Sequence, residues 1–128
     1  MDLQYEAVRD GEPSPGEVAW AWVPYEDDPT RGKRRPVLVV DTDGGDVLAL
    51  QLTSKDHDRD QQQEARAGRF WMDIGSGPWD RRGRPSEVRL NRVIRFAADD
   101  LDQVDIALDP LIFQAVAAAA RPYLGLAP

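Results

Sequence analysis

Two apolar runs joined by a short polar turn constrain the fold of this 128-residue chain most strongly. The first run, Pro36 to Asp41, is rich in β-branched valines, and the second, Val47 to Thr53, alternates its side chains with the period of a strand. The turn between them reads Asp-Gly-Gly-Asp from Asp43 to Asp46, which is typical of a β-hairpin. The sequence therefore predicts two antiparallel strands that meet at this turn.

Further strands and one helix are predicted around the hairpin. The strands are Glu17 to Tyr25, Arg69 to Ile74 and Ser86 to Phe96, with a helical turn and an extended piece between Ala98 and Ala107. Trp20 and Trp22 share one face of the first strand, and we expect both to pack in the core. Asp109 followed by Pro110 predicts the start of a helix that runs to about Arg121. The chain is thus expected to be mainly β with a C-terminal helix over the sheet.

Length and composition predict a single globular domain. Hydrophobic residues make up 41% of the chain, which is enough for a modest core. Residues 1–15 are polar and contain Gly11, Pro13 and Pro15, so we expect a flexible leader there and one domain over residues 16–128. The chain has no cysteine, which excludes a disulfide framework and a thiolate zinc site. No apolar run reaches the ~18 residues of a membrane span, so we expect a cytoplasmic protein with no membrane partner.

The charge is unevenly distributed along the chain. The net charge of −7 argues against nucleic-acid binding when the chain is taken as a whole. However, residues 31–96 carry a net +4 between two acidic ends, and 12 of their 14 basic residues are arginines. Arginine is suited to bidentate contacts with phosphate. The centre of the chain is therefore compatible with an anionic partner.

A cluster of cations lies directly before the first hairpin strand. Its members are Arg31, Lys33, Arg34 and Arg35. The strand that follows fixes the end of this loop, so the loop could present a guanidinium group to a phosphate. The alternative is a surface ion pair between Arg35 and Asp27 or Asp28.

The second hairpin strand ends in two hydroxyl side chains, Thr53 and Ser54, which on their own are ordinary strand-end residues. The polar segment from Lys55 to Gly68 follows and contains His57, the only histidine, among acids. A solvated loop is favoured over a metal site there, because the segment has no ligand-spacing motif. A second Arg-rich loop begins at Trp79, whose ring is either a stacking platform for a base or part of the core.

Four short stretches, taken in order, resemble the MazF/PemK family of toxins from bacterial toxin–antitoxin pairs. They are Gly16-Glu-Val, Gly32-Lys-Arg-Arg35-Pro36-Val-Leu-Val-Val, Leu52-Thr53-Ser54 and Ser86-Glu-Val-Arg-Leu-Asn-Arg-Val93. The resemblance covers roughly Gly16 to Arg121. It implies a small SH3-like β-barrel of the MazF/PemK/CcdB type that forms a homodimer. It also implies a sequence-specific endoribonuclease that cuts single-stranded RNA without metal or cofactor, and a cognate antitoxin that covers the RNA groove.

The resemblance also assigns the site. Arg35 matches the family's catalytic arginine before proline, and Thr53 matches its catalytic threonine. Two further residues, Arg89 and Asn91, fall where some members carry a functional Arg and Asp. Because the second residue is Asn here, a mechanism that uses that Asp as the base is in doubt. The residues expected to contact RNA are Arg31, Lys33, Arg34, Ser54, Lys55, His57, Arg89 and Asn91.

The implied chemistry is attack of an RNA 2′-hydroxyl on the adjacent phosphate, which gives a 2′,3′-cyclic phosphate and a 5′-hydroxyl. Arg35 is expected to stabilise the transition state, because a guanidinium group hardly deprotonates. Thr53 is a weak base unless a neighbour assists it, so the general base stays open, with His57 as one candidate. The loops Pro24–Lys33 and Lys55–Gly68 are expected to select the RNA sequence.

Two other functions remain alternatives at this stage. Gyrase-poisoning toxins share this type of barrel and act by protein contact, which suits the acidic net charge. A catalytically inactive SH3-like module is the other alternative, and it would bind without cleavage.

Overall fold

The computed structural model describes residues 1–8, 10–54 and 61–127. Its elements are β1 (Glu17–Pro24), β2 (Gly32–Asp43), β3 (Asp46–Ser54), α1 (Gln61–Arg66), β4 (Trp71–Gly75), β5 (Ser86–Ala97), a 3-10 turn (Ala98–Asp100), β6 (Asp102–Ala107) and α2 (Pro110–Ala120). The prediction of a mainly β chain with a C-terminal helix is confirmed. No helix in these ranges is long and apolar enough to cross a membrane.

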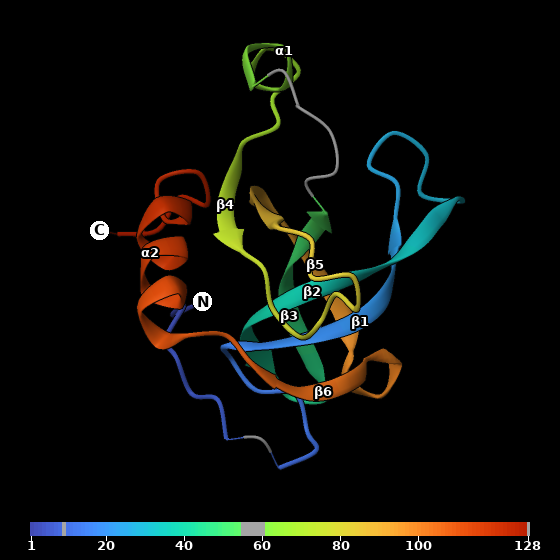
Figure 1. Cartoon of the computed structure of the whole chain (residues 1–128). Helices are drawn as coiled ribbons and strands as arrows, with labels where there is room; N and C mark the ends of the chain where they lie inside the picture. Colours follow the sequence, from blue (N-terminus) through green and yellow to red (C-terminus); the bar gives the residue numbers. More distant parts are fainter. Residues whose placement is uncertain (9, 55–60, 128) are drawn as a thin grey trace.

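The strands form one curved antiparallel sheet in the order β4-β5-β3-β2-β1-β6 (Figure 1). The predicted hairpin is present, with Asp43 paired to Asp46 across the turn and Gly44 in the left-handed region at a φ of 64°. Register shifts interrupt four of the five strand pairs, and such irregularities bend and twist a sheet. Within the described residues β4 and β6 do not pair, so the expected small barrel takes the form of a curved, open sheet.

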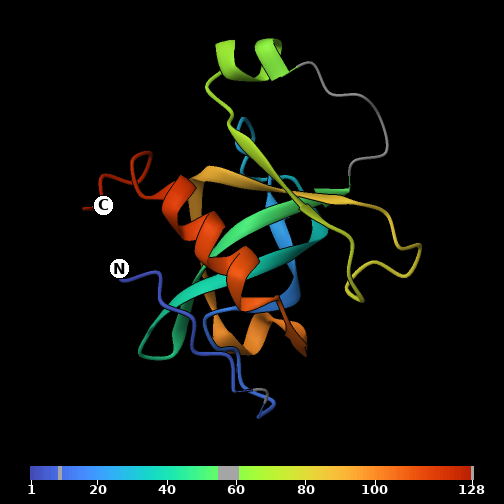
Figure 2. The ribbon, with the colours of Figure 1, turned by 60° about the vertical axis from the view of Figure 1, so that its left-hand side comes forward.

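Helix α2 lies across one face of the sheet (Figure 2). Asp109 caps its N-terminus, because Oδ1 accepts hydrogen bonds from the backbone N–H groups of Leu111 at 2.8 Å and Ile112 at 3.4 Å. The helix buries Phe113 and Val116 in one core cluster with apolar residues of the sheet. Alternate residues of the same strands form a second cluster on the opposite face. Both faces of the central strands are therefore covered.

The tryptophan face of β1 was predicted wrongly. Ala19, Ala21 and Val23 are buried, whereas Trp22 is 51% exposed and Trp20 is half-buried. Alternation alone fits burial of either face. Here the small side chains belong to the second core cluster, and the large rings lie outside it.

The first 15 residues pack against the first strand and the C-terminal helix. Leu3 is buried, and the Tyr5 ring packs edge-on against Phe113 with ring centroids 5.5 Å apart. The Tyr5 hydroxyl donates to the carbonyl of Leu108 at 2.9 Å, and the Ser14 backbone N–H donates to the buried carboxylate of Glu17 at 2.7 Å. These contacts attach the segment to α2 and β1, whereas its treatment as a separate flexible leader stays a prediction.

Candidate active site

The pairing of β2 with β3 brings Arg35 and Thr53 together. Val37 pairs with Gln51, and the same register carried two residues along each strand places Arg35 opposite Thr53. Nη1 of Arg35 donates a hydrogen bond to Oγ1 of Thr53 at 3.3 Å. Thr53 is 8% exposed and Arg35 is half-buried, so the pair lies at the edge of the core with access to solvent. The two residues predicted as catalytic, 18 positions apart in sequence, are therefore in direct contact.

Arg35 lines two cavities on either side of this contact. The first, which we call the arginine pocket, has a volume of about 300 Å³ and is lined by Glu26, Gln51, Arg69, Trp71, Arg89 and Arg92 in addition to Arg35. The second, the threonine pocket, has about 240 Å³ and includes Trp20, Arg34, Thr53, Ser54 and Arg84 with Arg35. The Arg35–Thr53 pair thus lies where a basic cavity meets a hydroxyl-bearing one.

Arg89 forms the floor of the arginine pocket and is only 4% exposed. Its Nη1 and Nη2 donate to the two carboxylate oxygens of Glu26, each at 3.1 Å, and its Nε donates to Oδ1 of Asn91 at 2.6 Å. The hydrogen bond from Arg89 is the main cause that lowers the pKa of the Glu26 carboxyl, against a smaller opposing effect of burial. Glu26 is therefore the anionic partner of a buried guanidinium group.

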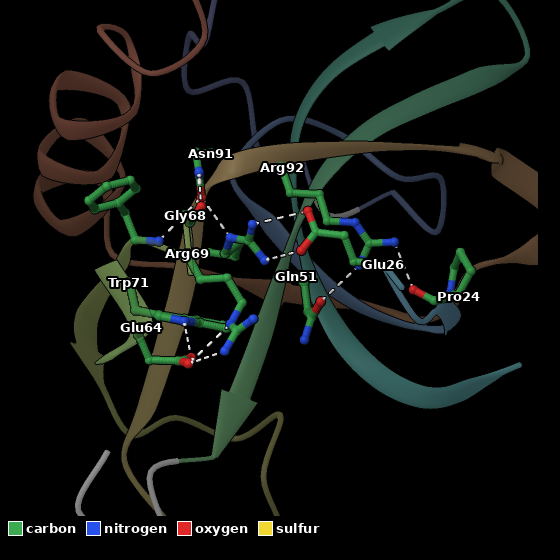
Figure 3. Close-up of polar contacts among 11 residues, drawn as sticks. Pro24, Glu26, Gln51, Glu64, Gly68, Arg69, Trp71, Asn91 and Arg92 are labelled. Carbon is green, nitrogen blue, oxygen red and sulfur yellow. Dashed lines mark hydrogen bonds and ion pairs between the residues drawn. The ribbon is translucent and has the colours of Figure 1, made fainter. Parts of the chain in front are cut away.

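Asn91 binds the backbone that leads into β4, next to this pocket. Its Oδ1 accepts from the backbone N–H of Phe70 at 3.3 Å, and its Nδ2 donates to the carbonyl of Gly68 at 2.6 Å (Figure 3). Together with the bond from Arg89, these contacts occupy both ends of the amide. Asn91, predicted to contact RNA, thus orients Arg89 and fixes residues 68–70.

Arg92 lies in the same pocket as Arg89. Its Nη2 donates to the carbonyl of Pro24 at 2.7 Å and its Nη1 donates to Oε1 of Gln51 at 3.3 Å (Figure 3). Burial lowers the pKa of the Arg92 guanidinium, Arg89 adds to the lowering, and Glu26 opposes it. The positive charges of Arg89 and Arg92 therefore lie close together, and the Glu26 carboxylate partly balances them.

Helix α1 contacts two lining residues of the arginine pocket, Arg69 and Trp71, and its presence corrects the prediction of a polar loop from Lys55 to Gly68. The described part of that range contains Gln61–Arg66, a run of good helix formers. Glu64 on this helix accepts hydrogen bonds from the Arg69 guanidinium and, at 3.0 Å, from Nε1 of Trp71 (Figure 3). The Glu64 hydrogen bond is the main cause that raises the pKa of Arg69.

The other predicted RNA contacts divide into three groups. Ser54 ends β3 next to Thr53 and lines the threonine pocket with Lys33 and Arg34. Arg34 is salt-bridged to Asp102 at 2.8 Å, with its guanidinium carbon 5.9 Å from the centre of the Trp20 ring. Arg31 is exposed beside the Tyr25 ring. Lys55 and His57 lie outside the described residues.

Trp79 is part of the core and is not an exposed stacking platform. It is 4% exposed, its Nε1 donates to Oγ of Ser86 at 2.9 Å, and its carbonyl accepts from Nε1 of Trp20 at 3.1 Å.

The sequence did not single out Glu26 or Arg92 for this pocket. Residues three apart in a regular strand point to opposite faces, so Arg89 and Arg92 are not expected to share a cavity. In β5, however, Leu50 pairs with Val93 and Leu52 with Val88, so β5 has three more residues than β3 between these pairs. This irregularity brings both arginines into one pocket, and no sequence pattern marks it.

Comparison with known proteins identifies the family. Residues 14–124 match the family model of PemK-like, MazF-like toxins of type II toxin–antitoxin systems. This chain therefore belongs to that family. No curated protein sequence is similar enough to count as a relative.

Solved structures with a similar fold come from several bacteria. An endoribonuclease from a mycobacterial species, in complex with its cognate antitoxin, has a TM-score of 0.59 and 20% identity over 91% of this chain and 98% of its own. The MazE–MazF complex from Deinococcus radiodurans has a TM-score of 0.59 and 17% identity over 92% of this chain and 100% of its own. The Mycobacterium tuberculosis toxin MazF-mt6 has a TM-score of 0.51 and 16% identity over 86% of this chain and 99% of its own. At these identities the likeness concerns the fold alone.

Proposed function

We propose that this toxin is a sequence-specific, metal-independent endoribonuclease that cuts single-stranded RNA at Arg35 and Thr53. The observation that carries the proposal is the hydrogen bond between these two side chains at the junction of two solvent-accessible cavities. Membership of the MazF-like toxin family supports it. Similar folds include proteins named as endoribonucleases, one of them bound to an antitoxin.

The reaction is a transesterification within the RNA, in which the 2′-hydroxyl loses its proton to a base and the leaving 5′-oxygen takes up a proton. The 2′-oxygen attacks the adjacent phosphorus, the bond from phosphorus to the 5′-oxygen breaks, and the products are a 2′,3′-cyclic phosphate and a 5′-hydroxyl. Negative charge grows on the phosphate oxygens as the bond forms, and the Arg35 guanidinium stabilises it. Because Oγ1 of Thr53 already accepts a bond from Arg35, its hydroxyl hydrogen is directed elsewhere, towards a phosphate oxygen or the 2′-oxygen.

Neither Glu26 nor Asn91 is suited to act as the general base. Glu26 is held by Arg89, and the lowered pKa of its carboxyl makes it a weaker base. The Asn91 amide has no basic site at neutral pH. His57, which lies outside the described residues, stays a candidate because an imidazole can act as a base near neutral pH.

Further parts of the proposal concern binding and partners. The exposed cations Arg31, Lys33 and Arg34, with Ser54, Lys55 and His57, contact the RNA backbone and bases. The protein acts as a homodimer in the cytoplasm, and a cognate antitoxin covers the basic groove. The mycobacterial endoribonuclease of similar fold, solved with its cognate antitoxin, is the precedent for such a partner.

A toxin that binds a protein target such as DNA gyrase is the second candidate, and an inactive SH3-like module is the third. The net charge of −7 favours contact with protein over contact with RNA, so these candidates need a direct test.

The test is cleavage of a long mixed-sequence transcript by the purified protein in EDTA. The proposal predicts discrete fragments with 5′-hydroxyl ends, and their loss in Arg35→Ala and Thr53→Ala variants that keep the wild-type fold. An intact transcript with folded protein would favour the protein-binding candidate, and cleavage at the wild-type rate by Arg35→Ala would remove Arg35 from the mechanism.

A further inference from the structure

We propose that the arginine pocket is a second anion site that binds an RNA phosphate next to the one that is cut, and that Glu26 occupies this site in the RNA-free protein. The inference rests on the proposed function for the identity of the anion, because the reaction brings a polyanion to Arg35. The geometry of the site comes from Arg89, Arg92 and Glu26 themselves.

The contact between Arg89 and Glu26 has the geometry of a phosphate complex. Both terminal nitrogens of the guanidinium face the two carboxylate oxygens, each at 3.1 Å. A guanidinium group binds two phosphate oxygens in the same fork-like way. Arg89 cannot turn freely, because it is buried and its Nε is bound to Asn91 at 2.6 Å. The carboxylate oxygens of Glu26 therefore mark the places of two phosphate oxygens.

The charges around the pocket allow an RNA phosphate to replace the Glu26 carboxylate. Four arginines line it, Arg35, Arg69, Arg89 and Arg92, against the acids Glu26 and Asp27. Arg69 is already salt-bridged to a carboxylate on α1. A phosphodiester group carries one negative charge, as a carboxylate does, so it can replace Glu26 without changing the local charge balance.

Glu26 is the replaceable member of this contact. Its side chain is 50% exposed, whereas that of Arg89 is 4% exposed, so the anion side of the pair opens to solvent. Glu26 comes from the connection between β1 and β2, which is closed by a hydrogen bond of 2.8 Å from the N–H of Tyr25 to the carbonyl of Arg31. Rotation of the Glu26 side chain therefore frees Arg89 while the turn stays in place.

The pocket is continuous with the Arg35–Thr53 pair. Arg35 lines both the arginine pocket and the threonine pocket. An RNA chain bound at the Arg35–Thr53 pair would therefore place a neighbouring phosphate near Arg89 and Arg92. Such phosphate contacts fix the register of a strand without reading its bases. The site thus positions RNA, and Glu26 competes with it.

The test compares Glu26→Gln with Asp28→Asn, which removes the same charge from the same loop. Asp28 does not line the arginine pocket, and Asn can still accept the hydrogen bonds from Thr30. The probes are inorganic phosphate and a fluorescent RNA oligonucleotide that is 2′-O-methylated throughout and so cannot be cut. NMR of the arginine Nε–H groups reports phosphate binding, and fluorescence anisotropy reports RNA binding. Because an internal competitor lowers apparent affinity, we expect Glu26→Gln to bind both probes about fivefold tighter or more, and Asp28→Asn to resemble the wild type.

Two further variants keep the result interpretable. Glu26→Asp is too short to span both nitrogens and should show part of the gain. Adding Arg92→Gln to Glu26→Gln should abolish the gain. Equal affinities for the two single variants would overturn the proposal, and so would a gain for an oligo-glutamate peptide without a gain for phosphate or RNA.

The outcome separates this inference from the proposed nuclease. A gain in phosphate binding with an uncut transcript supports the anion site and counts against the nuclease. Cleavage by the wild type without any gain in Glu26→Gln overturns the anion site alone.

Discussion

Replacement of Arg89 by methionine should destabilise the protein by about 2 kcal/mol. Methionine keeps the apolar length of the side chain but deletes the guanidinium group. The two bonds to Glu26 are lost, and since that carboxylate is 50% exposed, water replaces them and the pair counts as at most about 1 kcal/mol. The bond to Asn91 adds about 1 kcal/mol, because Oδ1 keeps its bond from the backbone of Phe70.

This value lies below the ~3–5 kcal/mol seen when a fully buried ion loses its partner, since Glu26 reaches water. For a chain of this length it corresponds to a melting temperature lower by about 4–8 °C. Thermal unfolding followed by circular dichroism measures it. Arg95→Met is the matched control, because its salt bridges to Asp43 and Asp46 are exposed, and it should leave the melting temperature unchanged. An Arg89→Met protein that melts with the wild type would refute the reasoning.

Three further predictions concern stability. The folded-state pKa of Glu26 is depressed, so the carboxylate stabilises the fold at neutral pH and this stabilisation is lost as the pH falls below the ordinary value of 4.5. The free energy of unfolding, measured with denaturant at pH 7 and pH 3, should therefore fall less in Glu26→Gln than in the wild type. Asp109→Ala removes the cap of α2 and should cost about 1 kcal/mol in urea unfolding, whereas Gln114→Ala, exposed on the same helix, should not; equal stability of the two would contradict the cap. Gly32→Ala would place a Cβ 2.5 Å from a backbone carbonyl and should cost about 1–3 kcal/mol, while Gly45→Ala meets open space and should be neutral in the same assay.

The strands and α2 could be predicted because their signals are local. The hairpin turn at Gly44 and Gly45, the alternation in β3 and the Asp109 cap each depend on a few neighbouring residues. The face of β1 that is buried could not be predicted this way. It depends on which partner strands flank β1, and Trp20 and Trp22 alternate as regularly as the alanines between them.

The candidate site was predictable only in part. The resemblance named Arg35 and Thr53. Their contact depends on the register shift between Val39 and Asp41, because the register of the turn alone would place Arg35 opposite Ser54. The arginine pocket depends on the irregularity in β5 and on Glu26 from a distant loop, and neither leaves a local pattern. Arg89 was expected at a surface that contacts RNA, and the structure buries it beneath Glu26.

The most direct test of the central claim uses one RNA oligonucleotide with a mapped cleavage site, cut by the wild-type protein in EDTA. A second oligonucleotide carries a single 2′-deoxy sugar on the 5′ side of that bond and is otherwise identical. Attack by the 2′-hydroxyl at Arg35 and Thr53 predicts that the modified bond stays intact while the unmodified oligonucleotide is cut to a 2′,3′-cyclic phosphate. Cleavage of the modified bond at an equal rate would contradict the account.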